Sequence, residues 1–319
     1  MLRQMKKMTD KNKCFVGFDT SNYTTSIAVC DIDGNVVANF KAPLSVSQGE
    51  RGLRQSDAVF AHIKNLPMLS DKLAEVLREY EPLAVGVSAF PREAENSYMP
   101  CFLCGIAAAK TFAAQNSLHV YNTAHQNGHI MAALYSSGEG EKLLEKQFLA
   151  FHVSGGTTEA LLVTPNEDKS GFSVKLVGET ADINAGQAID RAGVMMGLAF
   201  PAGKELEILA SQYSGKLERK KICVRDMRCN LSGIENISKE LYSKTKDKQL
   251  VAAVVFDFIC RTLCEMTEQI FSVYGTMPVL FAGGVMSNSI IKEKITSKYK
   301  NASFAYPDFS CDNAAGIAY

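Results

Sequence analysis

Short apolar runs separated by polar turns recur along this chain, a pattern typical of β-strands. Residues 14–40 contain three such runs, and the Asp/Gly segment 31–35 forms the predicted turn between the last two. Further along, the apolar runs 148–153 and 159–163 flank Ser154-Gly155-Gly156-Thr157-Thr158. This second pattern predicts a β-hairpin whose tip has small side chains and many free backbone N–H groups. Such a tip can bind an anion.

The two hairpin patterns resemble each other. Aligned without gaps, Ser21, Thr24 and Thr25 fall on Ser154, Thr157 and Thr158, with a constant separation of 133 residues. The repeat predicts a duplicated fold in which each half has a phosphate-binding turn. Two unrelated hairpins with ordinary polar turns are the alternative, and the likeness between the hairpins favours duplication.

Helical patterns alternate with these strands. Residues 56–80 have apolar positions at helical spacing, and Pro67 predicts a kink or a restart within that helix. Residues 83–90 and 118–121 have strand patterns, and the small-residue helix predicted at 101–115 lies between them. A strand, a helix and a strand in this order predict a parallel strand pair with a right-handed crossover, so the fold class is α/β.

The second half continues in the same way. Residues 250–274 predict a long buried helix, and 278–282 predict a buried strand that ends in Gly283-Gly284 at the start of a helix. Turns of this kind bind nucleotides in α/β folds, although two glycines after a strand are a weak signal alone.

The length of 319 residues favours two lobes. We expect a first lobe over residues 1–135 and a second over 146–302, with residues 303–319 packing back on the first. The charged segment Ser136–Glu145 is the predicted linker.

Composition narrows the classes of function. Lys+Arg and Asp+Glu both number 34, so net charge attracts neither nucleic acid nor membrane, and RNA contact would require a local basic patch. No segment approaches ~20 apolar residues, which predicts no membrane association. Nine scattered cysteines indicate a reducing cytoplasm. Cys101 and Cys104 form a CxxC that suits redox or metal chemistry, but without a second pair, buried structural thiols are favoured.

His125 and His129 are four residues apart on a predicted helix. This spacing brings both imidazoles to one helix face, as binding of a single metal ion requires. The alternative is that one histidine caps the helix and the other packs in the core.

Several acidic residues occupy positions of chemical interest. Asp19 ends the first strand and faces whatever the first tip binds, whereas Asp182 and Asp190 are eight residues apart, close to one face of a predicted helix. Asp312-Asn313 lies at a predicted helix start, where an acidic residue caps the helix or binds a metal.

The order of the motifs resembles one family, the tRNA threonylcarbamoyladenosine transferases of the actin and sugar-kinase superfamily. The matching positions are Val153-Ser154-Gly155-Gly156, Asp190, Gly203 in a Phe-Pro-Ala-Gly turn, Ser232-Gly233, Ala282-Gly283-Gly284-Val285 with Asn288, and Asp312-Asn313-Ala314-Ala315. The resemblance runs from about Phe15 to the last residue and implies a two-lobed, actin-like α/β fold with duplicated mixed sheets.

The resemblance also implies ligands and partners. His125, His129 and Asp312 would hold one divalent metal, Fe or Zn, with Mg as a further option. ATP or threonylcarbamoyl-adenylate would be bound by Ser154, Gly155, Gly156, Asp190, Gly203, Gly283, Gly284 and Asn288. Asp19 and Thr157 would be catalytic. The acceptor would be tRNA, and protein subunits of the same machinery would be partners.

The departures from the family pattern concentrate in the first lobe. Tyr23-Thr24 replaces an acidic Asp-Glu pair, Asn127 replaces the Glu of an HxEGH motif, and Thr157 replaces a histidine. Residues 89–93 replace a Gly-Pro-Gly-Leu loop, and residues 55–60 replace a Pro-Glu-Leu-Ala-Ser-Arg segment. Near that segment only His62 is kept.

These departures leave two functions open: a transferase that acts on tRNA or another acceptor, and a non-catalytic paralog that binds nucleotide and metal as a partner subunit. A peptidase would need the Glu of HExxH, which this chain lacks. A sugar or acetate kinase would share only the fold.

Overall fold

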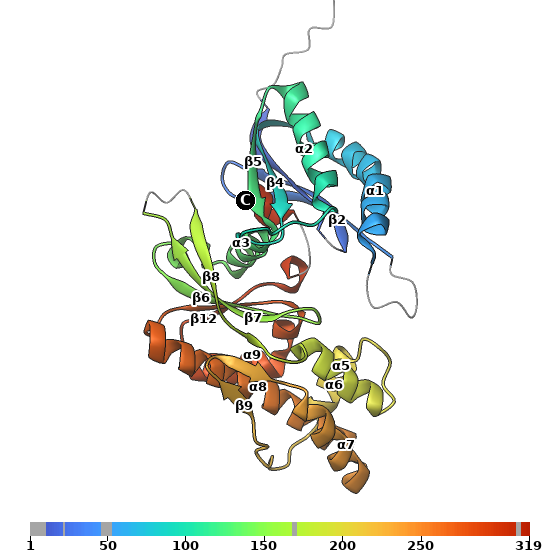
Figure 1. Ribbon diagram of the computed structural model, residues 1–319, viewed down its shortest axis with the longest axis vertical. Coiled ribbons are helices and arrows are strands. Elements are labelled where there is room, and N and C mark those ends of the chain that lie inside the picture. The colour runs from blue at the N-terminus through green and yellow to red at the C-terminus, as the bar shows by residue number, and fades with distance from the viewer. Residues whose placement is uncertain (1–10, 22, 46–52, 168–170, 311–313) are drawn as a thin grey trace, which may run out of the picture. The chain divides into compact units, whose positions relative to one another are not determined.

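The computed structural model of the protein describes residues 11–21, 23–45, 53–167, 171–310 and 314–319 (Figure 1). The chain divides into two compact units, one formed by residues 1–135 with 311–319 and the other by residues 136–310. Each unit is built on its own β-sheet, so the predicted α/β class is confirmed.

The first unit has a five-stranded sheet in the order β3-β2-β1-β4-β5. Its strands are β1 (Asn12–Asp19), β2 (Thr24–Asp31), β3 (Val36–Pro43), β4 (Tyr80–Phe90) and β5 (His119–Ala124). The first three strands pair antiparallel, while β4 pairs parallel with both β1 and β5. Both the predicted three-strand meander and the predicted parallel pair are therefore confirmed.

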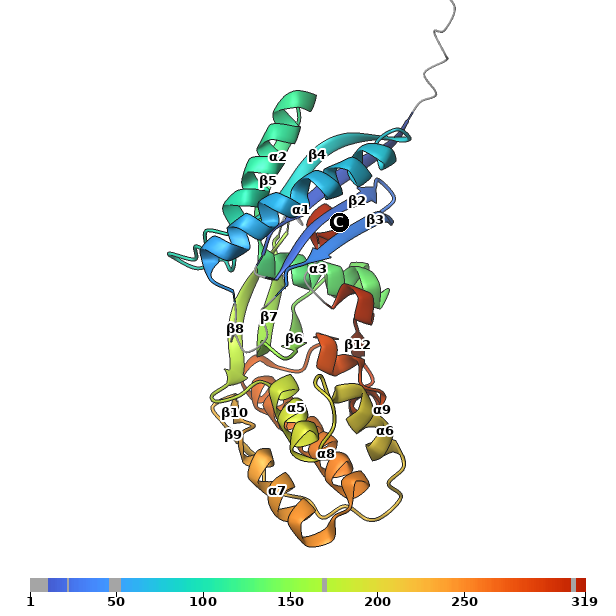
Figure 2. The ribbon, with the colours of Figure 1, turned by 90° about the vertical axis from the view of Figure 1, so that its right-hand side faces the viewer.

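The two faces of this sheet are covered differently (Figure 2). Phe18 of β1 lines a groove between α1 (Gln55–Val76) and α2 (Phe102–Asn116). The neighbouring residue Gly17 faces the other way, where α10 (Ala315–Ala318) lies directly against the sheet. Alternation along β1 thus places the helix pair on one face and the C-terminal helix on the other.

Helix α1 runs without interruption through Pro67, so of the two predicted alternatives, a kink or a restart, the restart is wrong. Proline removes one helical hydrogen bond, to the carbonyl group four residues earlier. That residue is Ile63, which is 56% exposed, so water can satisfy its carbonyl group.

The second unit has a seven-stranded sheet in the order β12-β11-β6-β7-β8-β10-β9. Its strands are β6 (Phe148–Val153), β7 (Thr158–Pro165), β8 (Phe172–Thr180), β9 (Cys223–Arg225), β10 (Arg228–Asn230), β11 (Val279–Ala282) and β12 (Ala302–Phe304). The predicted hairpin is the antiparallel pair β6 and β7. The predicted buried strand is β11, which runs parallel to β6.

One large apolar core holds the second unit together. The 27-residue helix α8 (Lys248–Tyr274) supplies its centre, as its nearly continuous apolar sequence predicts. The other helical elements are α4 (Gly140–Leu143), α5 (Ala185–Met195), α6 (Gly203–Ser211), α7 (Gly233–Thr245), α9 (Ser289–Lys298) and the short 3₁₀ turns η1 (Gly284–Ser287) and η2 (Pro307–Phe309).

Residues 136–145, which the sequence predicts to be a linker, include α4, and Leu143 is buried.

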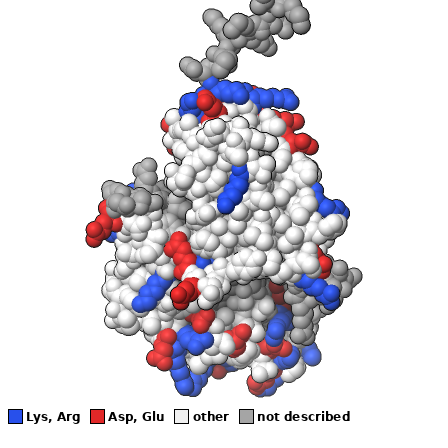
Figure 3. Space-filling model, turned by 45° about the horizontal axis from the view of Figure 1, so that its top comes forward, with Lys and Arg blue, Asp and Glu red and all other residues white. Residues whose placement is uncertain are grey.

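Within the described segments, no helix is long and apolar enough to cross a membrane. On the face shown in Figure 3, positive and negative side chains are interspersed, in keeping with the equal numbers of acidic and basic residues.

Candidate functional site

Asp19 and His125 form the centre of the candidate site in the first unit. Parallel β1, β4 and β5 bring their carboxyl ends to one edge of the sheet, where Asp19 ends β1 and His125 follows β5. The Asp19 side chain is fully buried, and its Oδ2 lies 2.7 Å from Nδ1 of His125. Its Oδ1 accepts a hydrogen bond of 2.7 Å from the backbone N–H of Ser21.

This pair defines the tautomer of His125. Beside an ionised Asp19, a neutral imidazole carries its proton on Nδ1, which leaves the lone pair on Nε2. A carboxylate behind a histidine in this way is the usual second layer of a metal site.

His129 lies one turn further along α3 (His125–Ser137), and the two imidazole centroids are 4.4 Å apart. The donor set therefore fits one metal ion with nitrogen ligands. Asp312, the third ligand implied by the resemblance, lies outside the described residues. Within the described part of the chain, no three His, Cys, Asp or Glu residues gather into a metal-binding cluster.

Glycines position the helix that carries both histidines. A side chain at Gly128 would strike Ile317 of α10, and one at Gly316 would strike the backbone of α3 at Gly128 and Ala132. The two helices can pack this closely only because both positions lack a Cβ. The C-terminal segment thereby sets the position of α3.

His62 is a further histidine in this unit, and unlike His125 it is fully buried, at 0% exposure on α1. Asn65 donates to Thr25 Oγ1 at 3.1 Å, and that hydroxyl lies 2.9 Å from His62 Nδ1. Burial lowers the pKa of His62, so it stays neutral in the fold.

The loop that departs from the family pattern contacts the start of α3. The backbone N–H of Gln126 donates to the carbonyl oxygen of Pro91, and Asn127 Nδ2 donates to Glu93 Oε1 at 2.7 Å. A carboxylate therefore lies beside Asn127, the position at which the family pattern has a glutamate. The sequence offered no signal for this contact, because Glu93 and Asn127 are 34 residues apart.

In the second unit, the tip of the β6–β7 hairpin uses its own N–H groups. Ser154 Oγ accepts from the N–H groups of Gly156 and Thr157 at 3.2 and 3.1 Å, and Ser154 N–H donates to the Thr157 carbonyl oxygen. The prediction that the tip has many free N–H groups is therefore wrong for Ser154, Gly156 and Thr157. A serine that starts a tight turn competes for the N–H groups that follow it.

Two further segments meet this tip. The N–H of Gly186, in the first turn of α5, donates to Ser154 O at 3.0 Å, and a Cβ on Gly186 would lie 2.7 Å from Gly155 Cα. Gly283, which follows β11, has φ +99° and lies against the carbonyl oxygen of Val153. The tip, the start of α5 and the Gly283-Gly284 turn thus form one surface at the carboxyl ends of two parallel strands, where α/β folds bind nucleotides.

The polar residues predicted to bind nucleotide make structural hydrogen bonds. Asp190 Oδ1 accepts from the N–H of Ala202 at 2.8 Å and so positions the turn before Gly203. Asn288 caps α9 by accepting from the N–H of Ile291. Thr157 is half-buried beside the tip glycines.

Asp182 was expected to share a helix face with Asp190, and this is wrong because α5 begins only at Ala185. Its carboxylate instead accepts hydrogen bonds from Ile183 N–H, Leu231 N–H and both the N–H and hydroxyl of Ser232, at 2.6 to 3.0 Å. Burial raises the pKa of Asp182, but these hydrogen bonds outweigh that effect and lower the pKa to about 2. Asp182 therefore anchors the Ser232-Gly233 segment.

Comparison with solved structures supports the predicted actin-like and sugar-kinase-like fold. HypF from T. kodakarensis superimposes on 97% of this chain, with 47% of its own length, a TM-score of 0.59 and 12% identity. Component A of (R)-2-hydroxyglutaryl-CoA dehydratase from Acidaminococcus fermentans matches over 96% of both chains, with a TM-score of 0.51 and 11% identity. At these identities the likeness concerns the fold alone.

The sequence identifies the family. Residues 98–319 match the family described as tRNA N6-adenosine threonylcarbamoyltransferase, and the chain belongs to it. Proteins of that name from Streptococcus pneumoniae (strain Taiwan19F-14) and Streptococcus sanguinis (strain SK36) are each 28% identical to this chain, over 97% of it and 91% of their own lengths. The predicted family is therefore confirmed.

Proposed function

We propose that this chain transfers a threonylcarbamoyl group from an adenylate to N6 of adenosine in tRNA and depends on a divalent metal. Membership of the family supports the reaction class. The observation in this chain that supports catalysis best is the buried Asp19–His125 pair, since it prepares Nε2 of a histidine that lies one turn from a second histidine.

In this proposal His125, His129 and Asp312 hold the metal, which is Fe or Zn, or alternatively Mg. When bound, the metal supplies a Lewis acid that polarises a carbonyl group or binds a phosphate. Asp19 orients His125 and keeps its proton on Nδ1, so it acts on the reaction through the histidine.

The nucleotide, ATP or threonylcarbamoyl-adenylate, is placed at the surface formed by Ser154-Gly155-Gly156, Gly186 and Gly283-Gly284. A phosphate that takes the N–H groups of Gly156 and Thr157 displaces the Ser154 hydroxyl from them. Asp190 and Asn288 shape the neighbouring backbone, and Gly203 leaves room beside the turn. The Thr157 hydroxyl is the polar side chain proposed to face the reacting group.

The test is direct. Purified protein is incubated with synthetic threonylcarbamoyl-adenylate and unmodified tRNA, and the modified nucleoside is measured by mass spectrometry. We expect transfer, about one equivalent of metal per chain, and loss of both in His129→Ala. A metal-free wild type that retains full transfer would contradict the metal role, and absence of transfer under all metal conditions would contradict the proposed reaction by the chain alone.

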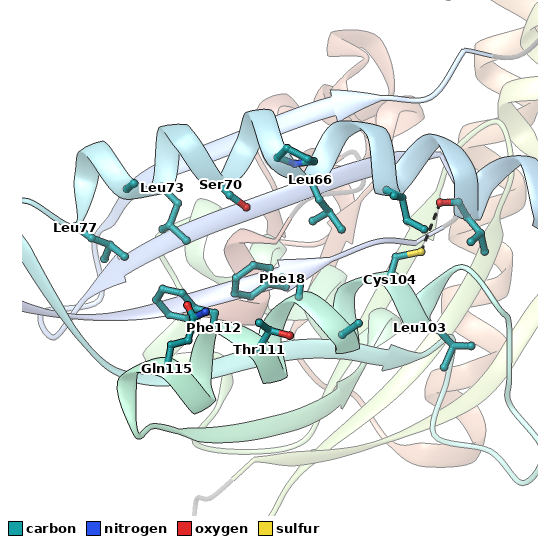
Figure 4. Close-up of a pocket in the computed structure, with 16 residues that line it drawn as sticks. Phe18, Leu66, Ser70, Leu73, Leu77, Leu103, Cys104, Thr111, Phe112 and Gln115 are labelled. Atoms are coloured by element: carbon teal, nitrogen blue, oxygen red, sulfur yellow. Dashed lines mark hydrogen bonds between the residues drawn. The ribbon is translucent and has the colours of Figure 1, made fainter.

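The second candidate, a partner subunit, is favoured by one specific surface. A groove of about 710 Å³ lies between α1 and α2, and its lining is almost entirely apolar (Figure 4). Leu103 and Ile63 on its rim are 50% and 56% exposed. Exposed apolar surface on a helix pair suits helices of another protein subunit.

The partner-subunit hypothesis makes a separate prediction. Ile63→Glu with Leu103→Glu should abolish binding of a partner subunit while adenylate binding persists. If transfer by the isolated chain equals transfer in the presence of family subunits, a solely auxiliary role is excluded.

A further inference from the structure

We infer that the segment from Lys216 to Asn230, here called the basic ribbon, binds the phosphate backbone of RNA. The inference rests on the proposed function, because it assigns the surface that holds the tRNA acceptor. Three features of this segment support the inference: its positive charge, the alternating exposure of its side chains, and the hydrogen bonds that hold its backbone in place.

The basic ribbon concentrates positive charge in a chain whose charges otherwise balance. Between residues 216 and 228 it has six cations, which are Lys216, Arg219, Lys220, Lys221, Arg225 and Arg228, against only Glu218 and Asp226. This is the local basic patch that RNA contact requires in a neutral chain.

The exposure of these side chains alternates. Arg219, Lys221, Cys223 and Arg225 are exposed, whereas the residues between them, Lys220, Ile222 and Val224, are half-buried. Alternate residues of an extended segment project on one side, about 7 Å apart. Residues 219–225, which lead into and include β9, the terminal strand of the second sheet, therefore present a row of cations to solvent.

At the end of this row the fold places like charges together. Arg225 and Arg228 are directly opposite each other in the β9–β10 register, so their side chains share one face. Like charges in this position repel. The turn that joins them, Asp226-Met227, has φ values of +51° and +63°, which are unfavourable for a residue such as methionine.

Neighbouring acids neutralise only part of the ribbon. Arg228 pairs with Glu179 at 3.0 Å and Lys220 with Glu218 at 2.6 Å, and Glu240 on α7 is also close enough to feel the charge of Lys220. Within the described residues, no acid forms an ion pair with Lys216, Arg219, Lys221 or Arg225.

Helix α8 holds the ribbon in place. Gln269 accepts from the N–H of Met227 at 3.0 Å and donates to the carbonyl oxygen of Val224, so one side chain supports both sides of the turn. Arg261 donates to the carbonyl oxygen of Lys220 at 2.8 Å. The cations therefore extend from a fixed backbone, which lowers the entropy that a bound partner must remove.

A polyanion is the partner that suits a rigid row of uncompensated cations. Contacts with successive phosphates release counterions and so stabilise the complex strongly at low salt. Arginine adds planar, bidentate recognition of phosphate.

The test uses charge reversal. Arg219→Glu/Lys221→Glu/Arg225→Glu should weaken binding of an unmodified tRNA transcript, measured by fluorescence anisotropy, on the order of 100-fold at 0.1 M salt. The slope of log affinity against log salt concentration should decrease in magnitude by about 3, which is about 1 for each lost cation. The control, Lys13→Glu/Lys142→Glu/Lys239→Glu, makes the same change in net charge at lysines that pair with acids elsewhere.

An alternative role for these cations is to prevent the exposed sheet edge from pairing with another chain. Glutamates prevent such pairing as lysines do, so charge reversal should affect RNA binding but not this alternative role. If the reversed variant binds tRNA with wild-type affinity and salt dependence, or if the control loses as much affinity, the inference is overturned. If wild-type protein itself does not bind tRNA, the proposed function fails instead. Adenylate binding should be unchanged in every variant.

Cys223 provides a second readout from within the row. Its side chain is exposed between Lys221 and Arg225. Bound tRNA should therefore protect Cys223 from alkylation, followed by mass spectrometry of the peptide that contains it. Equal alkylation with and without saturating tRNA would contradict the inference, even if charge reversal weakened binding.

Discussion

Asp19 Oδ2 and His125 Nδ1 lie 2.7 Å apart, although the two residues are separated by 106 positions in the sequence. The carboxylate is buried, so water does not weaken its hold on the imidazole. Asp19→Asn keeps the shape but removes the charge that holds the proton on Nδ1. We expect metal affinity to fall about 10- to 100-fold, measured by competition with a chelator. Asp33→Asn, in an exposed turn, is the control, and equal affinity in both variants would contradict the role of Asp19.

His62 should make stability depend on pH. Its pKa in the folded protein is lowered from 6.5 by burial, so the unfolded chain binds a proton more readily than the fold does. His62 therefore leaves the free energy of unfolding unchanged above pH 6.5 and lowers it as the pH falls below that value. Urea unfolding should therefore show a loss of stability below pH 6.5 that is smaller in His62→Gln. Identical pH profiles for the two proteins would refute this assignment.

Asp182 should act over a lower pH range. Its pKa of about 2 lies below the ordinary value of 3.8, so its stabilising effect is complete above pH 3.8 and is lost as the pH falls toward 2. Because solvent still reaches much of this partly buried side chain, we expect Asp182→Asn to cost only about 1 kcal/mol at pH 7. Glu293→Gln, an exposed position in the same unit, should leave the unfolding free energy unchanged.

Substitutions at two adjacent glycines distinguish a role in folding from a role in nucleotide binding. Gly283→Ala places a methyl group against the Val153 carbonyl oxygen at φ +99°, and should destabilise the protein by more than about 1 kcal/mol. A Cβ at Gly284 meets open space, so Gly284→Ala should fold normally. If the nucleotide approaches this turn as proposed, Gly284→Ala will weaken adenylate binding, measured by calorimetry, without changing thermal stability. Unchanged binding would place the nucleotide elsewhere.

Glu93 can replace the carboxylate that the family pattern has at position 127. Glu93→Gln still accepts a hydrogen bond from Asn127 Nδ2 but cannot carry or accept a proton in the same way. If Glu93 serves as an acid or base, kcat should fall about 100-fold with little change in KM. An alanine at Glu95, an exposed residue of the same loop, should leave kcat unchanged. A Glu93→Gln enzyme with normal kcat would reduce this contact to a structural one.

Much of the fold follows from the sequence, because apolar periodicity reports burial directly. The β6–β7 hairpin, the meander formed by β1, β2 and β3, and the long helix α8 all follow that pattern. The β9–β10 hairpin does not, because its three-residue strands are too short for a period and its turn lacks glycine.

The candidate site was harder to predict, since its geometry depends on contacts between distant residues. The spacing of His125 and His129 indicated a shared helix face, but neither the buried link to Asp19 nor the contact between Glu93 and Asn127 has a local signature. The Ser154 tip shows the opposite case. Its composition suggested free N–H groups, yet the serine that starts the turn occupies them.

Helix α10 also has a consequence for how the protein is made. Gly17 and Gly86 lie directly against the backbone of residues 314–318, which follow the whole second unit in the chain. During synthesis on the ribosome, the strands that carry Asp19 therefore emerge early but gain their covering helix only after the second unit has emerged. The unit that begins the chain is thus completed last, when the helix that packs against α3 at Gly128 becomes available.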